Sequence, residues 1–427
     1  MKALIIAITL FFCVINAQAQ VWSVQKQALT INEVLNDRID NLLPKLMDEA
    51  NIDCWLISSR EYNEDPILKT FLPAEWLSAR RTTILVFYRD KKKNTLNSYA
   101  IARYQVGKRI QAAWNPEKEP NQWLALSKLI DSLNPNQIGL NTSMDYGHAD
   151  GLHLTEFNEL KNAMSPSQLN KIVSAQKLGV AWLETRTEKE MALYPTLLAI
   201  THQIIKEGFS NQVIQPNQTS TNDLVWWFRQ KIIDLGLSTW FHPSIEIQRR
   251  VSNENDAIIR PGDLLHVDFG ISYLRLNSDV QEHAYVLLPN EKVAPDELVA
   301  AFSKTNRLQD ILTTNFKTGR TGNAILAASI QQAKAEGIQP SIYTHPIGSH
   351  GHAAGTTIGM WDMQQGVPGS GDYAMRPNTC YSIELNATHT ILGWNKPVRI
   401  ALEQNGFFNG SGFEYLDGRQ KTIHLIQ

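Results

Sequence analysis

The sequence predicts an α+β protein with two domains. At 427 residues the chain is longer than one hydrophobic core supports, since single cores stop growing near roughly 250 to 300 residues. Apolar residues follow helical periodicity in some segments and strand alternation in others, along the whole length. A capping-box motif at Thr187 marks the start of a second unit. We therefore expect an α/β domain over residues 20–186 and an α+β catalytic domain over residues 187–427.

Residues 1–19 have the features of a secretory signal peptide. Lys2 precedes an apolar run over residues 3–15, and Ala17-Gln18-Ala19 fits the small-x-small pattern of a cleavage site. The apolar run is shorter than the roughly 20 residues that a membrane-spanning helix needs, and no later segment approaches that length. We expect the mature protein to be exported to the periplasm or the extracellular space, without a membrane anchor.

The charges are close to balanced. The chain has 40 basic and 42 acidic residues, a formal net charge of −2. This balance offers no basic footprint for nucleic acid or for an anionic membrane surface. Beyond the first 19 residues the cysteines are Cys54 and Cys380, which lie far apart in apolar or aromatic surroundings. We expect two buried free thiols rather than a disulfide.

The first domain is expected to alternate helices with short strands. Residues 31–50 and 122–133 have the apolar periodicity of helices, and residues 54–57 and 82–88 are rich in strand-forming residues. No tight cluster of His, Asp and Glu occurs in this half of the sequence. The chemistry is therefore expected in the second domain.

Two capping boxes open helices in the second domain. Thr187 and Glu190 begin a helix that we expect to run through residue 200 with a kink at Pro195. Ser220 and Asp223 begin another, which ends near residue 236. Strands are then expected at residues 263–269, 280–288, 380–385 and 398–403.

Acidic residues lie on the polar side of these apolar strands. In a strand over residues 264–270, Asp268 faces away from the apolar side chains, and Asp279 follows eleven positions later on the next strand. Glu384 and Glu403 occupy the same kind of position in the last two strands. A single buried acid is often satisfied by backbone amides or an arginine, so one such residue alone indicates little.

Histidines cluster in a glycine-containing segment over residues 344–352. His345, His350 and His352 lie within eight residues, and neutral imidazole is a common metal ligand. Four acids and a histidine converging in a core need cations, which the strands themselves hardly supply, so one or two divalent metals would neutralise them. Oxygen-rich ligation with one imidazole suits manganese, cobalt, zinc or iron. Two metals about 3.5 to 4 Å apart can hold a bridging hydroxide.

In order and spacing, these residues resemble the pita-bread metallopeptidases, which include methionine aminopeptidases, Xaa-Pro aminopeptidases and prolidases. The five residues that carry the resemblance are Asp268, Asp279, His345, Glu384 and Glu403. His352, seven positions after His345, resembles the second histidine of the family, and residues 376–379 resemble the stretch before its fourth ligand. The first half is similar to the creatinase-type domain of Xaa-Pro aminopeptidases and prolidases. The resemblance thus implies a creatinase-like α/β domain followed by a pita-bread catalytic domain.

The resemblance also implies how the ligands divide between two metals. Asp268 would chelate one ion, Asp279 and Glu403 would bridge both, and His345 and Glu384 would hold the second. Manganese is the first expectation, with cobalt, zinc or iron as alternatives. The implied activity is that of an aminopeptidase or dipeptidase, of Xaa-Pro type or otherwise, that attacks a short peptide with a bridging hydroxide. A homodimer is a further expectation from the resemblance.

Three residues receive catalytic roles by the same resemblance. Glu384 would double as general base, and His352 would bind the oxyanion or the substrate carbonyl. Arg399 resembles an arginine that orients the site or the substrate in Xaa-Pro members, and a plain salt bridge is the equal alternative.

The sequence departs from the family pattern at the last ligand and leaves a choice at the histidine. The family glutamate follows Arg-Ile directly, where this chain has Ala401; Glu403 lies two residues further on the same strand face. The glycines around His352 also resemble the surroundings of the ligand histidine. In that register His352 would be the ligand, and Gly359 would stand where the second histidine belongs.

The marks of proline specificity are incomplete. By the same resemblance, proline-specific members usually carry a histidine upstream of the first aspartate. This chain has Arg250 and Val251 in that window, and its nearest upstream histidine is His242. They also carry a histidine shortly before the ligand histidine, where this chain has Ser341. His350 has no family counterpart and is either a substitute or a surface residue.

Two other classes of function stay open. They are a metal-dependent enzyme on a non-peptide substrate and a non-catalytic binding protein on the same fold. A creatinase-like, metal-free hydrolase is disfavoured because all five ligand positions have candidates. The sequence has no Gly-x-Ser-x-Gly elbow, no His-Glu-x-x-His helix and no phosphate-binding glycine loop, so serine hydrolase, zincin and nucleotide-dependent functions lose their main support.

If export occurs as expected, the mature protein begins at Gln20, because Ala17 and Ala19 occupy the small-residue positions before the cut. Amino-terminal sequencing of the protein from its native host measures this directly. An intact Met1 would contradict the expectation.

Overall fold

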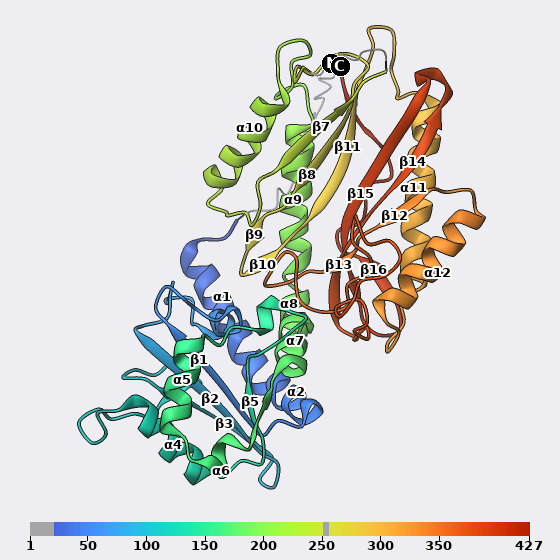
Figure 1. Ribbon diagram of the computed structural model, residues 1–427. Helices are drawn as coiled ribbons and strands as arrows, with labels where there is room; N and C mark the ends of the chain where they lie inside the picture. The colour runs from blue at the N-terminus through green and yellow to red at the C-terminus, as the bar shows by residue number, and fades with distance from the viewer. Residues whose placement is uncertain (1–20, 251–255) are drawn as a thin grey trace, which may run out of the picture.

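The computed structural model describes residues 21–250 and 256–427, which form two lobes (Figure 1). The expected signal peptide, residues 1–19, and Val251 lie outside the described residues. One β-sheet consists of residues before Thr187 and a second, larger sheet consists of residues after it. Among the described residues, none of the helices is both long and apolar enough to cross a membrane.

The first sheet has six strands in the order β4-β3-β2-β1-β5-β6. They are β1 (Cys54–Arg60), β2 (Thr82–Asp90), β3 (Thr95–Ile101), β4 (Gln111–Ala112), β5 (Ile138–Leu140) and β6 (Ile172–Ser174). Residues of α4 (Gln122–Leu133) and α5 (Leu154–Ala163) pack on one face of the sheet, and α2 (Leu43–Ala50), α3 (Pro66–Phe71) and α7 (Gln176–Glu184) pack on the other. A short helix, α6 (Pro166–Leu169), precedes β6. This half is the expected α/β lobe, and the predicted strands and the helix at 122–133 are confirmed.

The helix expected over residues 31–50 is interrupted. It consists of α1 (Val24–Asp37), a π-helical turn η1 (Arg38–Leu42) and α2 (Leu43–Ala50). Pro44 stands at the beginning of α2, where its missing backbone N–H breaks the regular hydrogen-bond ladder. The expectation of one continuous helix was wrong for this reason.

Both predicted capping boxes are confirmed, but the helix between residues 187 and 200 is not continuous. Thr187 and Glu190 cap the short α8 (Glu188–Met191), and Ser220 and Asp223 cap α10 (Thr221–Asp234). A new helix, α9 (Tyr194–Gly208), begins with Pro195 in its first turn. Proline is tolerated there because the first N–H groups have no helical partner. The proline therefore starts a helix instead of kinking one.

The second sheet is large and carries the predicted acidic strands. Its main path is β12-β14-β15-β11-β8-β7, with β13, β16 and β17 paired at its sides. The strands are β7 (Ser244–Gln248), β8 (Leu264–Phe269), β11 (Val280–Val286), β12 (Pro340–Ile342), β13 (His345–Pro346), β14 (Thr379–Ile391), β15 (Lys396–Phe408), β16 (Phe413–Tyr415) and β17 (His424–Ile426). A small hairpin of β9 (Ser272–Tyr273) and β10 (Leu276–Asn277) connects β8 to β11.

Helices cover one face of this sheet. In Figure 1, α9 and α10 lie along the β7–β8 side, and α11 (Asp296–Thr314) and α12 (Gly322–Ala335) lie along the β14 side. Every second residue of the central strands packs into these helices, among them Val267, Ile383 and Leu402. The alternate residues face away from the helices, which is where the pattern placed Asp268, Glu384 and Glu403. The expected buried free thiols, Cys54 and Cys380, are also confirmed.

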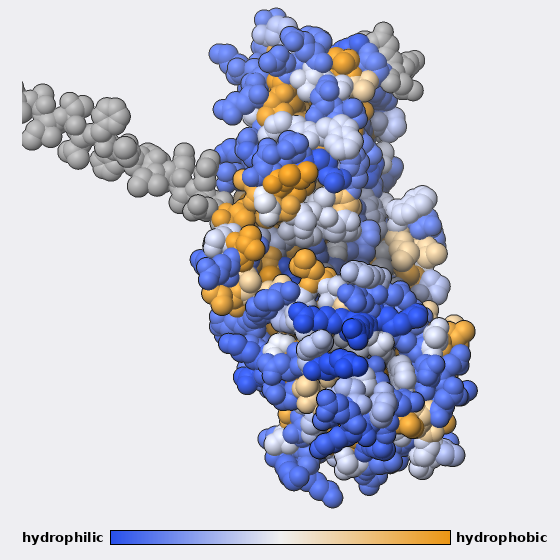
Figure 2. Space-filling model, turned by 90° about the vertical axis from the view of Figure 1, so that its left-hand side faces the viewer, coloured by the Kyte–Doolittle hydropathy of each residue, from blue (hydrophilic) through white to orange (hydrophobic). Residues whose placement is uncertain are grey.

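A buried ion network joins the two lobes. Arg38 of η1 donates to Glu190 of α8, and Arg186 donates to the other oxygen of the same carboxylate at 2.6 Å. All three residues are less than a tenth exposed. Nearby, a cavity of about 540 Å³ lies between α1 and α3 on one side and the β9–β10 hairpin on the other. On the face drawn in Figure 2, hydrophobic residues gather near the middle, where the lobes meet, and the lower lobe is mostly hydrophilic.

Replacing Glu190 with alanine should lower the free energy of unfolding by about 3 to 5 kcal/mol, because two buried arginines would lose their counter-charge. Asp223→Ala is the matched control: it removes the acid of the other capping box, which is exposed, and should cost much less. Chemical denaturation of both variants measures the difference. Equal losses would show that the buried network contributes no more than an exposed cap.

Candidate functional site

Four residues form a row across the open face of the second sheet. Asp268 on β8 is paired in register with Gln281 on β11, Gln281 is paired with Glu403 on β15, and Glu403 is paired with Glu384 on β14. Residues directly opposite one another on antiparallel strands have side chains about 5 Å apart on the same face. Three of the predicted ligands are therefore neighbours by strand pairing alone.

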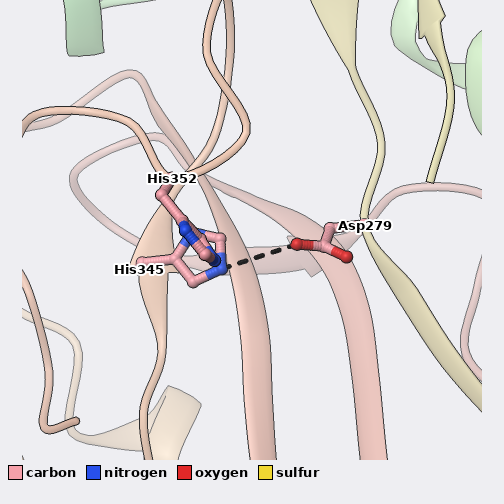
Figure 3. A group of neighbouring side chains, drawn as sticks. All are labelled: Asp279, His345 and His352. Atoms are coloured by element: carbon pink, nitrogen blue, oxygen red, sulfur yellow. Dashed lines mark ion pairs between the residues drawn. The ribbon is translucent and has the colours of Figure 1, made fainter. Parts of the chain in front are cut away.

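Asp279 and His345 complete the group. Asp279 lies immediately before β11, two residues before Gln281, and His345 lies on β13 opposite Ser382. His345 Nε2 lies 3.6 Å from Asp279 Oδ2, 3.5 Å from Glu403 Oε1 and 3.9 Å from Glu384 Oε2. Figure 3 draws the approach of His345 to Asp279. All five predicted ligands thus meet in one place, including Glu403, where the sequence departs from the family pattern.

His352 stands beside this group, on its exposed side. Its ring meets the ring of His345 edge-on, with the centroids 4.7 Å apart, and both rings lie near Asp279 (Figure 3). Burial and the neighbouring His345 lower the pKa of His352 to about 4, so its imidazole is neutral near pH 7. His345 approaches three carboxylates and His352 approaches one. This geometry favours His345 over His352 as the ligand histidine.

The electrostatics of the group favour divalent cations. Burial, together with the charge of Glu403, raises the pKa of Asp268, Asp279 and Glu384 well above the usual range. Asp268 Oδ1 and His345 Nε2 are buried without a hydrogen-bond partner among the described residues. Both atoms are ordinary metal ligands, and an unpaired buried polar atom is costly unless something binds it. These residues fit one or two hard or borderline divalent ions.

Polar residues that the sequence analysis did not single out support the ligands. Ser382 Oγ donates to Glu403 Oε1 at 2.7 Å. Asn405 receives the backbone N–H of Asp279 on its Oδ1 and donates its Nδ2 to Ser382 Oγ, both at 3.0 Å. Gln281 donates to Glu384 and Glu403. Each lies two positions from a predicted ligand on the same strand face, and that spacing is the signal that could have found them.

A cavity of about 320 Å³ opens beside the cluster. Asp268 and Glu384 line it at one end, and its other lining residues are Ser244, Glu246, His266, Gln281, Ser341, Tyr343, Trp361, Asn386 and Arg399. Arg399 Nη1 lies 3.3 Å from Glu246 Oε2, and its Nη2 donates to the hydroxyl of Tyr343 at 3.1 Å. Arg399 therefore faces the cavity that Asp268 and Glu384 also line, and it makes a salt bridge there with Glu246.

The hydroxyl of Tyr343 is held so that it can donate into this cavity. It accepts hydrogen bonds from Arg399 and, at 3.0 Å, from Asn386 Nδ2. Burial and the nearby Glu384 raise the pKa of Tyr343 to about 12, so the phenol keeps its proton. An oxygen that receives two donors still has its own O–H to give. The cavity thus offers one guanidinium and one phenolic donor near the carboxylates.

The two other histidines named in the sequence analysis, His350 and His242, lie elsewhere. The ring of His350 packs against His148 of the first lobe at 4.3 Å between centroids, and His350 lines the cavity between the lobes. His242 lies against Arg229 and Trp226. Neither residue joins the carboxylate cluster.

The chain belongs to metallopeptidase family M24, whose family model matches residues 196–409. That span contains the five clustered residues together with His352, Arg399 and Tyr343. The protein is therefore a metallopeptidase by family, and its metal dependence follows from the family and from the donor cluster.

Solved structures confirm the two-domain pita-bread fold. The X-Pro aminopeptidase of Thermotoga maritima aligns with a TM-score of 0.63 at 15% identity, over 89% of this chain and 99% of its own. The Xaa-Pro dipeptidase of Bacillus anthracis aligns with a TM-score of 0.54 at 16% identity, over 93% and 99%. The N-terminal domain of the FACT complex subunit SPT16 from chickpea aligns with a TM-score of 0.56 at 12% identity, over 95% and 99%. No curated protein sequence matches the chain.

Adding Mn²⁺ to chelator-treated protein should raise the melting temperature more at pH 8 than at pH 5. The pKa values of Asp268, Asp279 and Glu384 are higher in the folded protein than in the unfolded chain. The metal-free fold is therefore most stable at low pH, where these groups are protonated, and it loses free energy of unfolding as the pH rises through their folded-state pKa values. Cations replace the missing protons at the higher pH. Thermal melts at both pH values test this, and an equal gain at pH 5 and pH 8 would refute it.

Proposed function

We propose that this protein is an exported two-metal peptidase, either an aminopeptidase that removes the amino-terminal residue of short peptides or a dipeptidase that splits dipeptides. The observation that carries the proposal is the meeting of four carboxylates and His345 on one open sheet face, in a chain of the M24 family. Export rests on the sequence of residues 1–19 alone.

The five clustered residues would hold two divalent ions, manganese in the first place and cobalt, zinc or iron otherwise. Asp268 would bind one ion, Asp279 and Glu403 would lie between the two, and His345 with Glu384 would bind the other. Four carboxylates balance the charge of two divalent cations. When bound, such ions activate water at neutral pH and stabilise negative charge on a carbonyl oxygen.

Two residues of this chain would assist the reaction, Glu384 by proton transfer and His352 by a hydrogen bond. Glu384 lines the cavity beside the cluster, and once cations hold its carboxylate ionised it could accept a proton there. It would take the proton of the attacking water and return it to the nitrogen that leaves when the C–N bond breaks. His352 is neutral and stands on the exposed side of the cluster, where its N–H can donate to the carbonyl oxygen of the substrate.

The cavity beside the cluster would receive the substrate residue. Tyr343 and Arg399 are the donors that it offers, and Trp361 lies at its exposed edge. Such donors suit a polar or carboxylate-bearing end of a short peptide. The solved structures named for X-Pro and Xaa-Pro activity support a trial of proline-containing peptides, but Ser341 stands where the sequence expected a histidine for proline specificity.

A non-catalytic binding role is the second candidate, and the observation that favours it is the likeness to a domain whose title names a complex subunit and no peptidase. Against it stands the completeness of the donor cluster, because four carboxylates around a histidine, two of them buried, are costly without cations.

Metal analysis of the purified protein, combined with a screen of Xaa-Pro and other dipeptides and tripeptides, tests the proposal. We expect two divalent ions per chain and hydrolysis that a chelator abolishes and Mn²⁺ restores. A protein that binds no metal and cleaves none of the peptides would support the binding role instead.

Glu403→Gln sharpens this test at the position where the chain departs most from its family. The change keeps the size of the side chain but removes the charge shared by both ions, so metal content and hydrolysis should fall together. Glu384→Gln, measured beside it, should also lose hydrolysis. If Glu403→Gln retains two metals and full turnover, Glu403 is not a ligand. A buried acid that binds no metal would affect neither the metal content nor the rate of hydrolysis.

A further inference from the structure

Gln281 occupies the middle of the acidic row and is only 3% exposed. Its backbone is paired with Asp268 on one side and Glu403 on the other. Its Nε2 donates to Glu384 Oε1 at 2.6 Å and to Glu403 Oε2 at 2.9 Å. One neutral side chain therefore holds two of the candidate ligands at once.

The chemistry of its neighbours fixes the orientation of this amide. The NH₂ group faces the two glutamates and donates to both carboxyl groups, which offer it acceptor oxygens. On its other side, the amide oxygen lies 2.9 Å from Nε2 of His266, which can donate to it, and His266 in turn lies beside Glu246. A flipped amide would place its oxygen against two carboxylates and leave their donors missing.

This orientation decides which oxygen each glutamate presents to the centre. The oxygens bound by Gln281 are Oε1 of Glu384 and Oε2 of Glu403. The opposite oxygens, Oε2 of Glu384 and Oε1 of Glu403, lie 3.9 Å and 3.5 Å from Nε2 of His345. Each carboxylate is thus held from behind by the amide while its other oxygen faces the imidazole.

We propose that Gln281 is a positioning residue of the metal centre: it selects the carboxylate oxygens that face the cations and holds the two glutamates in place before the cations bind. The inference rests on the two-metal function proposed above. Glu384 and Glu403 are direct cross-strand partners, and like charges in such pairs repel unless a donor lies between them. Removing a residue that orients metal ligands typically lowers metal affinity by about 10- to 100-fold.

Titration of the metal-free protein with Co²⁺, followed by calorimetry and visible absorption, tests the role of Gln281. Gln281→Met keeps nearly the same length but has no N–H, so its Co²⁺ affinity should fall by about 10- to 100-fold and its absorption bands should shift. The bands report the ligand geometry, which a general loss of stability does not alter in a folded protein.

Gln404→Met is the matched control. Gln404 is 1% exposed and follows Glu403 on β15, so its side chain lies on the opposite face of the sheet. This variant loses a buried amide of the same kind and should keep the Co²⁺ affinity and spectrum of the unchanged protein. Should Gln281→Met fail to fold, Gln281→Asn replaces it, because an amide shorter by one methylene cannot reach both glutamates.

The outcomes separate this inference from the function on which it rests. Unchanged protein that binds no Co²⁺ overturns both. Two bound ions in the unchanged protein, with the same affinity and spectrum in the Gln281 variant, overturn the positioning role and leave the two-metal function intact. Equal losses in the Gln281 and Gln404 variants also overturn it, because the effect would then belong to any buried amide of this sheet.

Discussion

Electrostatic repulsion between four carboxylates is the constraint that the site face of the second lobe must satisfy. Asp279 and Glu403 are buried on this face, and Asp268 and Glu384 beside them are half-buried. In the absence of cations the fold tolerates them by keeping protons on some, as their raised pKa values indicate, and by surrounding them with neutral donors. The helices supply apolar packing on the opposite face only. The apolar packing on the helix-covered face therefore stabilises a sheet whose other face carries the carboxylates.

Strand alternation made much of this site predictable from the sequence. Asp268, Glu384 and Glu403 were recognisable because each is an acid on the polar side of an apolar strand, and alternation does not depend on knowing the partners of the strand. The capping boxes were recognisable for a similar reason, since both of their residues lie within one helical turn. Local rules succeeded for these features because the interactions that define them are local, whereas the helix breaks at Pro44 and Pro195 were misjudged.

The features that escaped prediction depend on contacts between distant segments. The role of Gln281 requires its register with Glu403, a residue more than a hundred positions away, and the donor arrangement at Tyr343 requires Arg399 and Asn386 from two other strands. The ion pair of Arg38 with Glu190 also escaped prediction, because the two residues belong to different lobes.

The long hairpin of β14 and β15 has a consequence for how this protein could vary. Glu384 and Glu403 face each other only because the turn at residues 392–395 sets their register. Adding or deleting one residue in either arm between that turn and the ligands would rotate one glutamate to the helix-covered face, whereas a change of two residues restores the face. We therefore expect insertions and deletions in these arms to keep both glutamates on the site face only when they involve an even number of residues. The departure noted in the sequence obeys that parity, because Glu403 lies two residues beyond Ala401.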